Sequence, residues 1–269
     1  MKNVLIITQN EPFYIPKMIK YILENKKKDI NIVGFTVLKP HRKNKSIYHW
    51  FMERAKIYSF LELMLVFLAM GVVKFFGFFN NRYSVKKIMD KNEVKNFPST
   101  DVNSDEYIEL IKPLDLDFVI SISCPHLFKK KLLSLPKLAC LNAHGTLLPR
   151  HRGVFGSWWT IFKKDKEAGG TIHTMELKLD AGKILWQEEF NVDDKDTQYS
   201  IAYKTKKMMA EGLLDVMENF SNKVATPIDP KHKTSYHRAP SKELGKDFHK
   251  KGNRVLTIND LKRMLSSKY

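Results

Sequence analysis

The first forty residues alternate between short apolar runs and one amphipathic segment. Residues 3–8 and 30–36 are apolar runs of strand length, and the segment between them repeats apolar side chains at helical spacing. Pro16 suits the first turn of that helix, because no backbone hydrogen bond is lost there. The order strand, helix, strand predicts a βαβ unit and therefore a parallel sheet. The apolar positions of the helix are Ile15, Met18, Ile19, Ile22 and Leu23.

Four more apolar runs of strand length follow, with helical segments between them. Ser104 is a candidate N-cap for a short helix to Lys112, and Asp196 or Thr197 for a long helix to about Phe220. This pattern predicts an α/β fold in which helices flank a mostly parallel sheet. The expected strands are 117–123, 138–141, 171–175 and 184–190. The inner side of the long helix is expected to carry Ile201, Met208, Met209, Leu213, Val216 and Met217.

Residues 57–79 form the most hydrophobic stretch of the chain. Their longest uncharged run, 63–73, lies between Glu62 and Lys74 and is shorter than the ~20 residues that a membrane span needs. We favour a helical insert packed on the domain, because a short apolar helix more often belongs to a core. A helix that lies on a membrane surface or binds a partner stays open as the alternative.

The length of 269 residues allows one large domain with an additional segment. We expect a catalytic domain over residues 1–225, with a helical insert at about 50–96, and a short C-terminal tail over residues 226–269. Residues 37–56 are basic and typical of a loop. Trp158 and Trp159 are expected to pack in the interior rather than to stack on a ligand.

A net charge of +17 favours anionic partners. The lysines are spread over the whole length without a nucleic-acid-binding motif, so a solvated basic surface is favoured over nucleic-acid binding. Cys124 and Cys140 lie in apolar context, which indicates buried thiols in a reducing compartment such as the cytoplasm. No histidine and cysteine cluster has metal-ligand spacing, so no metal is expected. The first strand is not followed by Gly-x-Gly-x-x-Gly, which argues against a dinucleotide cofactor.

Candidate chemistry concentrates in two segments, 141–153 and 169–184. Asn142 and His144 lie two residues apart at the end of a strand, so their side chains point to the same side of the sheet. Ligands of open α/β sheets bind at the carboxyl ends of strands. An amide beside an imidazole can stabilise a carbonyl oxygen that gains negative charge. In the second segment, a strand leads to a loop that contains Asp180 and Gly182.

The order of three motifs in these segments resembles that of the folate-dependent formyltransferase superfamily, and in particular of the sugar N-formyltransferases. The motifs are Asn-x-His at 142–144, Leu-Leu-Pro-x-x-x-Gly at 147–153 and Leu-Asp-x-Gly at 179–182. The resemblance covers about residues 3–184 and implies a Rossmann-like core with N10-formyltetrahydrofolate as the formyl donor. Gly145 and Thr146 replace the Pro-Ser or x-Ser often found after the histidine, and Thr146 keeps the hydroxyl.

The resemblance implies a role for each of several residues. The implied catalytic residues are Asn142, His144 and Asp180. The implied cofactor-binding residues are Pro125, His126, Leu127, Phe128, Leu177 and Leu179. The implied substrate-binding residues are Gln9, Asn10 and Arg152.

Formyl transfer requires a neutral amine to attack a carbonyl carbon, which leaves a negatively charged oxygen. A protonated His144 and the amide of Asn142 would hydrogen-bond this oxygen. Asp180 would hold the imidazole in its charged form and relay a proton from the attacking amine to the leaving nitrogen. This chemistry needs no metal.

We therefore expect an enzyme that formylates the amine of a nucleotide-linked amino sugar for surface polysaccharide biosynthesis. Glycinamide ribonucleotide and Met-tRNA are alternative acceptors, although nothing in the C-terminal residues resembles the β-barrel that binds tRNA. A formyltetrahydrofolate hydrolase is an alternative reaction, and a basic scaffold attached to a membrane through residues 57–79 is a non-enzymatic alternative. A homodimer and a membrane-peripheral location stay open.

Overall fold

A seven-stranded sheet forms the centre of the computed structural model, which describes residues 1–39, 52–79, 81–228 and 235–266. The strand order is β3-β2-β1-β4-β5-β7-β8. The strands β3, β2, β1, β4 and β5 run parallel, and β7 and β8 join antiparallel at one edge. The mostly parallel sheet is thus confirmed. The strands are β1 (Lys2–Gln9), β2 (Ile30–Leu38), β3 (Lys95–Asn96), β4 (Phe118–Ile122), β5 (Ala139–His144), β7 (Glu167–Thr174) and β8 (Ile184–Asn191).

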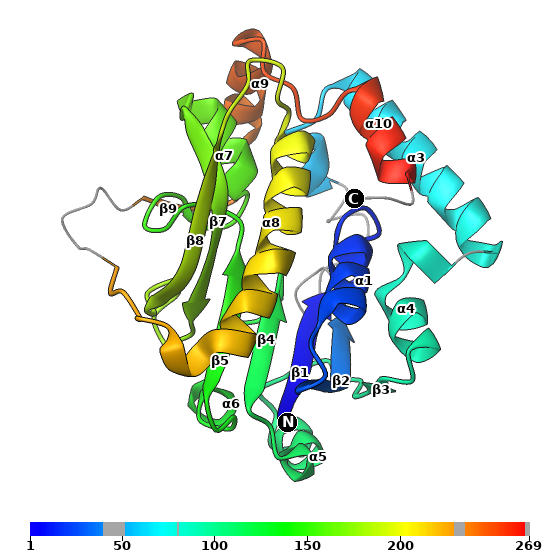
Figure 1. The fold of residues 1–269 in the computed structure, drawn as a ribbon. Coiled ribbons are helices and arrows are strands. Elements are labelled where there is room, and N and C mark those ends of the chain that lie inside the picture. Colours follow the sequence, from blue (N-terminus) through cyan, green and yellow to red (C-terminus); the bar gives the residue numbers. More distant parts are fainter. Residues whose placement is uncertain (40–51, 80, 229–234, 267–269) are drawn as a thin grey trace.

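Helices cover both faces of the sheet, because its strands carry apolar side chains on both sides. Val4 and Ile6 of β1 pack with α1 (Ile15–Asn25), α4 (Val85–Lys91) and α8 (Gln198–Asn219) on one face. Leu5 and Ile7 point the other way and pack with α5 (Asp105–Ile111) and α6 (Lys130–Leu133). Figure 1 shows α1 and α8 side by side over the first of these faces.

The caps of two helices follow the sequence prediction. The backbone N–H of Tyr107 donates to the Ser104 hydroxyl at the start of α5. Thr197 is the N-cap of α8, and its side chain and that of Ser200 each accept from the other's backbone N–H. These bonds satisfy amides that have no partner within the first helical turn, which places both helix starts where the sequence predicts them.

The hydrophobic stretch forms a helix, α3 (Phe60–Phe79), that packs on the domain along one side only. Ala69 is buried against Leu261 and Met264 of α10 (Ile258–Leu265), and Glu62 is 2% exposed. The remaining sides carry exposed apolar side chains, so the expected packed insert is correct for one side of the helix and wrong for the rest. These exposed residues are Phe60, Leu61, Met64, Phe67, Leu68, Met70, Phe75 and Phe76.

The helix α3 also exceeds the length that its uncharged run suggested. Its window Phe60–Gly77 has a mean hydropathy of 2.0 and is long and apolar enough to cross a membrane by length and composition alone. Only 17% of this window is buried. The preceding basic segment was expected to be a loop, and its residues 40–51 lie outside the described part of the chain.

The C-terminal residues pack into the same structure. The strand β9 (Tyr236–His237) pairs with β6 (Arg152–Gly153), and the Phe248 ring of α9 (Lys242–Lys250) stacks on Trp158 at 4.8 Å. Trp158 is fully buried, which confirms the expectation that it packs inside. The boundary at residue 225 stays a prediction. The other helices are α7 (Gly156–Lys163) and the 3₁₀ turns η1 (Asn81–Tyr83), η2 (Lys112–Leu114) and η3 (Phe220–Asn222).

We predict that Phe248→Ala lowers the free energy of unfolding of the whole domain by about 3–5 kcal/mol, because it removes a fully buried ring. Urea unfolding followed by circular dichroism measures this change. Leu110→Ala on α5 is the control, since Leu110 is 48% exposed. An unchanged main transition in Phe248→Ala would show that the C-terminal residues are an independent tail.

Candidate active site

The carboxyl ends of three parallel strands meet at one edge of the sheet. Thr8 of β1 is paired with Ile122 of β4, and Ile122 with Ala143 of β5. The next residues along each chain segment therefore emerge together. The segments at this edge are Gln9–Asn10 after β1, the loop 123–128 after β4, and His144 at the end of β5. The structure thus brings the predicted substrate and catalytic segments to the same edge.

Asn142 is held by a histidine from the neighbouring antiparallel strand. It is paired with His173 of β7, and its Nδ2 lies 3.1 Å from His173 Nε2. The other ring nitrogen, Nδ1, lies 2.8 Å from the Thr174 carbonyl oxygen. Since a carbonyl oxygen only accepts, Nδ1 carries the proton and Nε2 accepts from the amide. His173 therefore fixes which way the Asn142 amide faces.

Burial, and to a smaller extent the nearby His144, lower the pKa of His173 to about 4. His173 is thus neutral near pH 7, as its acceptor role toward Asn142 requires. Two histidines at this site do not charge independently, because a charge on one disfavours a charge on the other.

Asp180 lies between the two histidines. Its Oδ1 is 3.7 Å from His144 Nδ1 and 3.8 Å from His173 Nε2, and its Oδ2 accepts the backbone N–H of Gly153 at 2.8 Å. Both Asp180 and His144 are less than a tenth exposed. A buried carboxylate is stable only with such partners close by. The three predicted catalytic residues are therefore in one cluster.

Two glycines allow the loops of this cluster to approach each other. Gly153 has φ +99°, and a Cβ there would lie 2.3 Å from the His237 carbonyl oxygen. A Cβ at Gly182 would lie 1.7 Å from the carbonyl oxygen of Thr174. Asp180 itself has φ 48°, a conformation that a non-glycine residue adopts only when its surroundings hold it.

A second hydrogen-bonded chain supports the loop after His144. The Nε2 of His144 lies 3.2 Å from the carbonyl oxygen of His151. The His151 ring lies 2.6 Å from Asp165 Oδ2 on one side and 3.0 Å from His237 Nε2 on the other. Trp159 stacks on His237 with ring centroids 4.1 Å apart. The C-terminal β9 thus takes part in positioning His144 through His151.

A family model described as formyl transferase matches residues 79–217, which are 139 of the 269 residues. The chain belongs to the formyl transferase family. The matched region contains the whole Asn142, His144 and Asp180 cluster, and the membership confirms the resemblance read from the three motifs.

Curated formyl transferase relatives share 27–30% identity with this chain. The bifunctional polymyxin resistance protein ArnA of Wigglesworthia glossinidia brevipalpis is 27% identical over 65% of this chain and 27% of its own length. Methionyl-tRNA formyltransferase of Clostridium botulinum is 30% identical over 60% of this chain and 52% of its own. Methionyl-tRNA formyltransferase of Rickettsia africae is 28% identical over 71% of this chain and 63% of its own length. The chain spans less than two thirds of each relative.

Solved structures of formyltransferases have the same fold. A sugar N-formyltransferase from a Shewanella species has a TM-score of 0.56 at 20% identity and covers 99% of this chain and 89% of its own. An N-formyltransferase from Helicobacter canadensis, solved with folinic acid and dTDP-3-aminofucose, has a TM-score of 0.57 at 17% identity. The match covers 99% of this chain and 80% of that one. Glycinamide ribonucleotide transformylase from Symbiobacterium toebii has a TM-score of 0.58 at 13% identity. The match covers 85% of this chain and 95% of that one.

The predicted cofactor-binding loop follows β4 and offers one unused polar atom. The Nδ1 of His126 is buried and has no hydrogen-bond partner among the described residues. Leu127 is 60% exposed, whereas Phe128 is 4% exposed within the core beside α5. The Phe128 side chain therefore does not face the site, and its proposed role is restricted to the backbone. Pro125 is half-buried in the same loop.

The other predicted binding residues lie on the Asp180 loop and on β6. Leu177 is 69% exposed, and the carbonyl oxygen of Leu179 accepts from the Arg152 guanidinium at 2.5 Å. Arg152 thus joins the two catalytic loops and keeps a buried Nε without a partner in the described structure. Gln9 and Asn10 have no described contact with the catalytic cluster, and their roles stay predictions.

Sequence reasoning missed three residues at this edge: His173, Lys206 and Glu11. Lys206 of α8 donates to the Ser123 hydroxyl at 2.7 Å, and its burial lowers its pKa to about 8. Glu11 accepts the backbone amides of Phe13, Tyr14 and Ile15, just before and at the start of α1, and burial raises its pKa. His173 was detectable in principle, since it ends the strand that precedes Asp180. Lys206 carries no sequence signal that distinguishes it from other lysines.

We predict that His173 makes stability depend on pH. Its folded pKa of about 4 lies below the ordinary 6.5, so its contribution is present above pH 6.5 and is lost as pH falls toward 4. The loss is on the order of 2–3 kcal/mol. Urea unfolding of the wild type and His173→Gln between pH 7 and 4.5 should show a smaller fall in the variant. Parallel curves for the two proteins would contradict the buried neutral histidine.

Proposed function

We propose that this chain transfers a formyl group from N10-formyltetrahydrofolate to the amine of a nucleotide-linked amino sugar. The cluster of half-buried Asn142 with buried His144 and Asp180 at the carboxyl edge of the sheet carries the proposal. It supplies an amide donor, an imidazole and a carboxylate within a few ångströms of each other. That set suits acyl transfer to an amine, in which one oxygen gains charge and a proton must move.

Each residue of the cluster has a distinct role in this proposal. Asn142 donates its remaining amide hydrogen to the oxygen that becomes negative. The Nε2–H of a protonated His144, which faces the His151 carbonyl oxygen at 3.2 Å, turns to donate to the same oxygen. Asp180 stabilises the charged imidazole. It also takes the proton from the attacking amine and passes this proton to the leaving nitrogen. His173 is a positioning residue, because it acts by orienting the Asn142 amide.

The formyl donor supplies an activated acyl group when it is bound. The loop 124–128 fits a heterocyclic ligand with hydrogen-bonding edges, since His126 Nδ1 is a buried polar atom that a ligand would satisfy. Leu127 and Leu177 are exposed apolar side chains on the two loops that flank the cluster. The Helicobacter canadensis relative was solved with folinic acid, which supports a folate in this family fold.

The amino-sugar acceptor is supported by how far the structural similarity extends. A sugar N-formyltransferase and the N-formyltransferase solved with dTDP-3-aminofucose each match over 99% of this chain, and a sugar 3N-formyltransferase matches over 88%. Two glycinamide ribonucleotide formyltransferases match over 85% and 88%. We assign Gln9, Asn10 and Arg152 to acceptor binding. The positive charge of the chain would favour an anionic, nucleotide-linked acceptor. The surface polysaccharide pathway follows from this acceptor class and stays part of the proposal.

A cytoplasmic location is proposed with this function. Cys124 and Cys140 are free thiols, and burial raises the pKa of each to about 12, which keeps them protonated and unreactive. Met-tRNA is the second candidate acceptor, because methionyl-tRNA formyltransferases are among the curated sequence relatives.

The test is a formyl-transfer assay with N10-formyltetrahydrofolate and a panel of acceptors, read by product mass. The panel contains nucleotide-linked 3- and 4-amino sugars, glycinamide ribonucleotide and Met-tRNA. We expect an amino sugar that gains one formyl group. Formylation of Met-tRNA or of the ribonucleotide alone would replace the proposed acceptor, and release of formate without an acceptor would indicate a hydrolase.

We predict that Asp180→Asn lowers kcat by about 100- to 1000-fold while the protein stays folded, because the amide cannot hold His144 charged. Steady-state kinetics with the accepted amine measures this loss, and circular dichroism confirms the fold. Asp90→Asn is the matched control, since Asp90 lies on α4 and pairs with the exposed Lys86. Near wild-type kcat in Asp180→Asn would remove Asp180 from the mechanism.

A further inference from the structure

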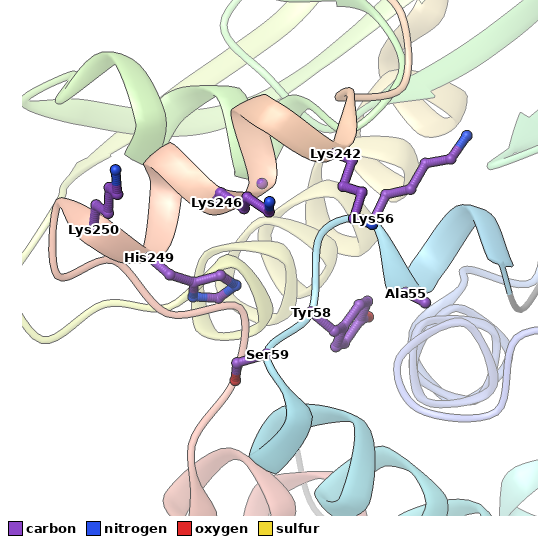
Figure 2. A pocket seen from close by; sticks show the side chains of 9 residues that line it. Ala55, Lys56, Tyr58, Ser59, Lys242, Lys246, His249 and Lys250 are labelled. Atoms are coloured by element: carbon purple, nitrogen blue, oxygen red, sulfur yellow. The ribbon is translucent and has the colours of Figure 1, made fainter.

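A lysine-lined groove lies beside the N-terminal end of α3, whose outward side is exposed. The groove has a volume of about 590 Å³ and lies between α9 and the residues that immediately precede α3. Figure 2 shows Lys242, Lys246 and Lys250 along α9, facing the segment that carries Tyr58 and Ser59. The groove is lined by Ala55, Lys56, Tyr58, Ser59, Lys242, Gly245, Lys246, His249 and Lys250.

Hydrogen bonds fix the start of α3 beside this groove. The Glu62 carboxylate accepts the backbone N–H groups of Ser59 and Val255 at 2.7 Å each, and it lies 3.5 Å from His249 Nε2. Glu62, one of the two charged side chains of α3, is thus buried and hydrogen-bonded inside the domain. The other, Lys74, is exposed. The outward surface of the helix is therefore almost entirely apolar.

The exposed apolar residues of α3 spread over a wide arc. At about 100° per residue, Phe60, Phe67 and Met70 lie on one flank and Leu61, Leu68 and Phe76 extend around the other, which together cover more than half of the circumference. A helix packed against one partner helix presents a narrower apolar stripe. The hydrocarbon of a lipid layer can contact a helix over a wide arc. A lipid layer therefore fits this surface better than a single partner helix does.

The charge of the groove favours an anionic lipid surface over a second copy of the chain as its binding partner. The groove is lined by four lysines and a histidine, and its described lining contains no carboxylate, although Lys56 reaches Glu53 outside it. A second copy of the chain would bring two such grooves together in a protein of net charge +17, and they would repel each other. An anionic phospholipid surface attracts the same lysines.

Both ends of α3 are attached to the same domain, which indicates that the helix lies on a membrane rather than across it. Ile57 before it is buried beside Trp158 and Phe248, and the Tyr83 hydroxyl after it donates to the Leu265 carbonyl oxygen at 3.2 Å. A span would separate these ends by the ~30 Å length of the helix on opposite sides of a bilayer. The contact of α3 with α10 along its length also keeps it parallel to the domain surface.

We propose that the exposed face of α3 and the adjacent lysine groove together bind the surface of an anionic phospholipid membrane. The apolar face enters the acyl boundary, and Lys242, Lys246 and Lys250 contact headgroup phosphates. In Figure 1, α3, α9 and α10 lie at the end of the molecule toward which β1, β4 and β5 run. The membrane-binding surface is thus at the same end as the catalytic edge. This proposal does not depend on the acceptor.

The test is sedimentation of the full chain with vesicles of phosphatidylcholine that contain about a third phosphatidylglycerol. We expect the wild type to bind. Phe67→Asp/Leu68→Asp should weaken binding by about 100-fold or more, because it places charges in the apolar boundary. Lys242→Glu/Lys246→Glu/Lys250→Glu should weaken it by about 100-fold at low salt. Raising the salt concentration should weaken wild-type binding as well.

Matched controls carry the same substitutions at the opposite end of the molecule. Leu110→Asp and Lys28→Glu/Lys112→Glu/Lys130→Glu should leave vesicle binding unchanged, and unfolding curves should show that every variant is folded. Absence of wild-type binding, or equal binding by wild type and both test variants, would overturn the proposal. So would a dimer, seen by sedimentation velocity without vesicles, that Phe67→Asp/Leu68→Asp dissociates while no protein binds vesicles.

Discussion

The site depends on burying one carboxylate, that of Asp180. A buried charge is stable only with hydrogen bonds and an opposite charge, and here these come from segments far apart in the sequence. The N–H of Gly153 binds one oxygen, while His144 and His173 approach the other. This arrangement requires the positive φ of Gly153, the absence of a side chain at Gly182, and the antiparallel pairing of β7 with β5. Asp180 therefore joins the loops that form this edge of the sheet.

The two histidines at this edge have different tasks because they share one environment. His173 is buried, donates to a carbonyl and accepts from Asn142, so its neutral form is the one that fits. The pKa of His173 falls to about 4 through burial, and the charge of His144 adds to that effect. A neutral imidazole with its Nδ1–H on a carbonyl oxygen can orient a neighbouring amide, as His173 does with Asn142. The family relationship and the geometry thus agree on an acyl transfer chemistry.

Local patterns were sufficient to predict six of the strands and the caps at Ser104 and at Asp196 or Thr197. The closeness of Asn142, His144 and Asp180 was implied by the resemblance of the motif order to a known family. Contacts between distant segments were not predictable in the same way. His173 acquires its role only from the antiparallel register opposite Asn142, and Lys206 only from the docking of α8 on the loop after β4. The strands β6 and β9 are two residues long, which is too short for a periodic sequence pattern to predict that they pair. For α3, composition predicted a helix, but which side is covered depends on α10.

The central claim is that His144 and Asp180 act as one unit, and kcat/KM for formyl transfer in a double-mutant cycle tests it most directly. The proteins are the wild type, Asp180→Asn, His144→Gln and the double variant. If Asp180 acts by holding His144 charged, either single change removes most of the effect, and the double variant is then hardly slower than the slower single variant. Losses that multiply in the double variant would mean that the two residues contribute independently, and would contradict this account of the site.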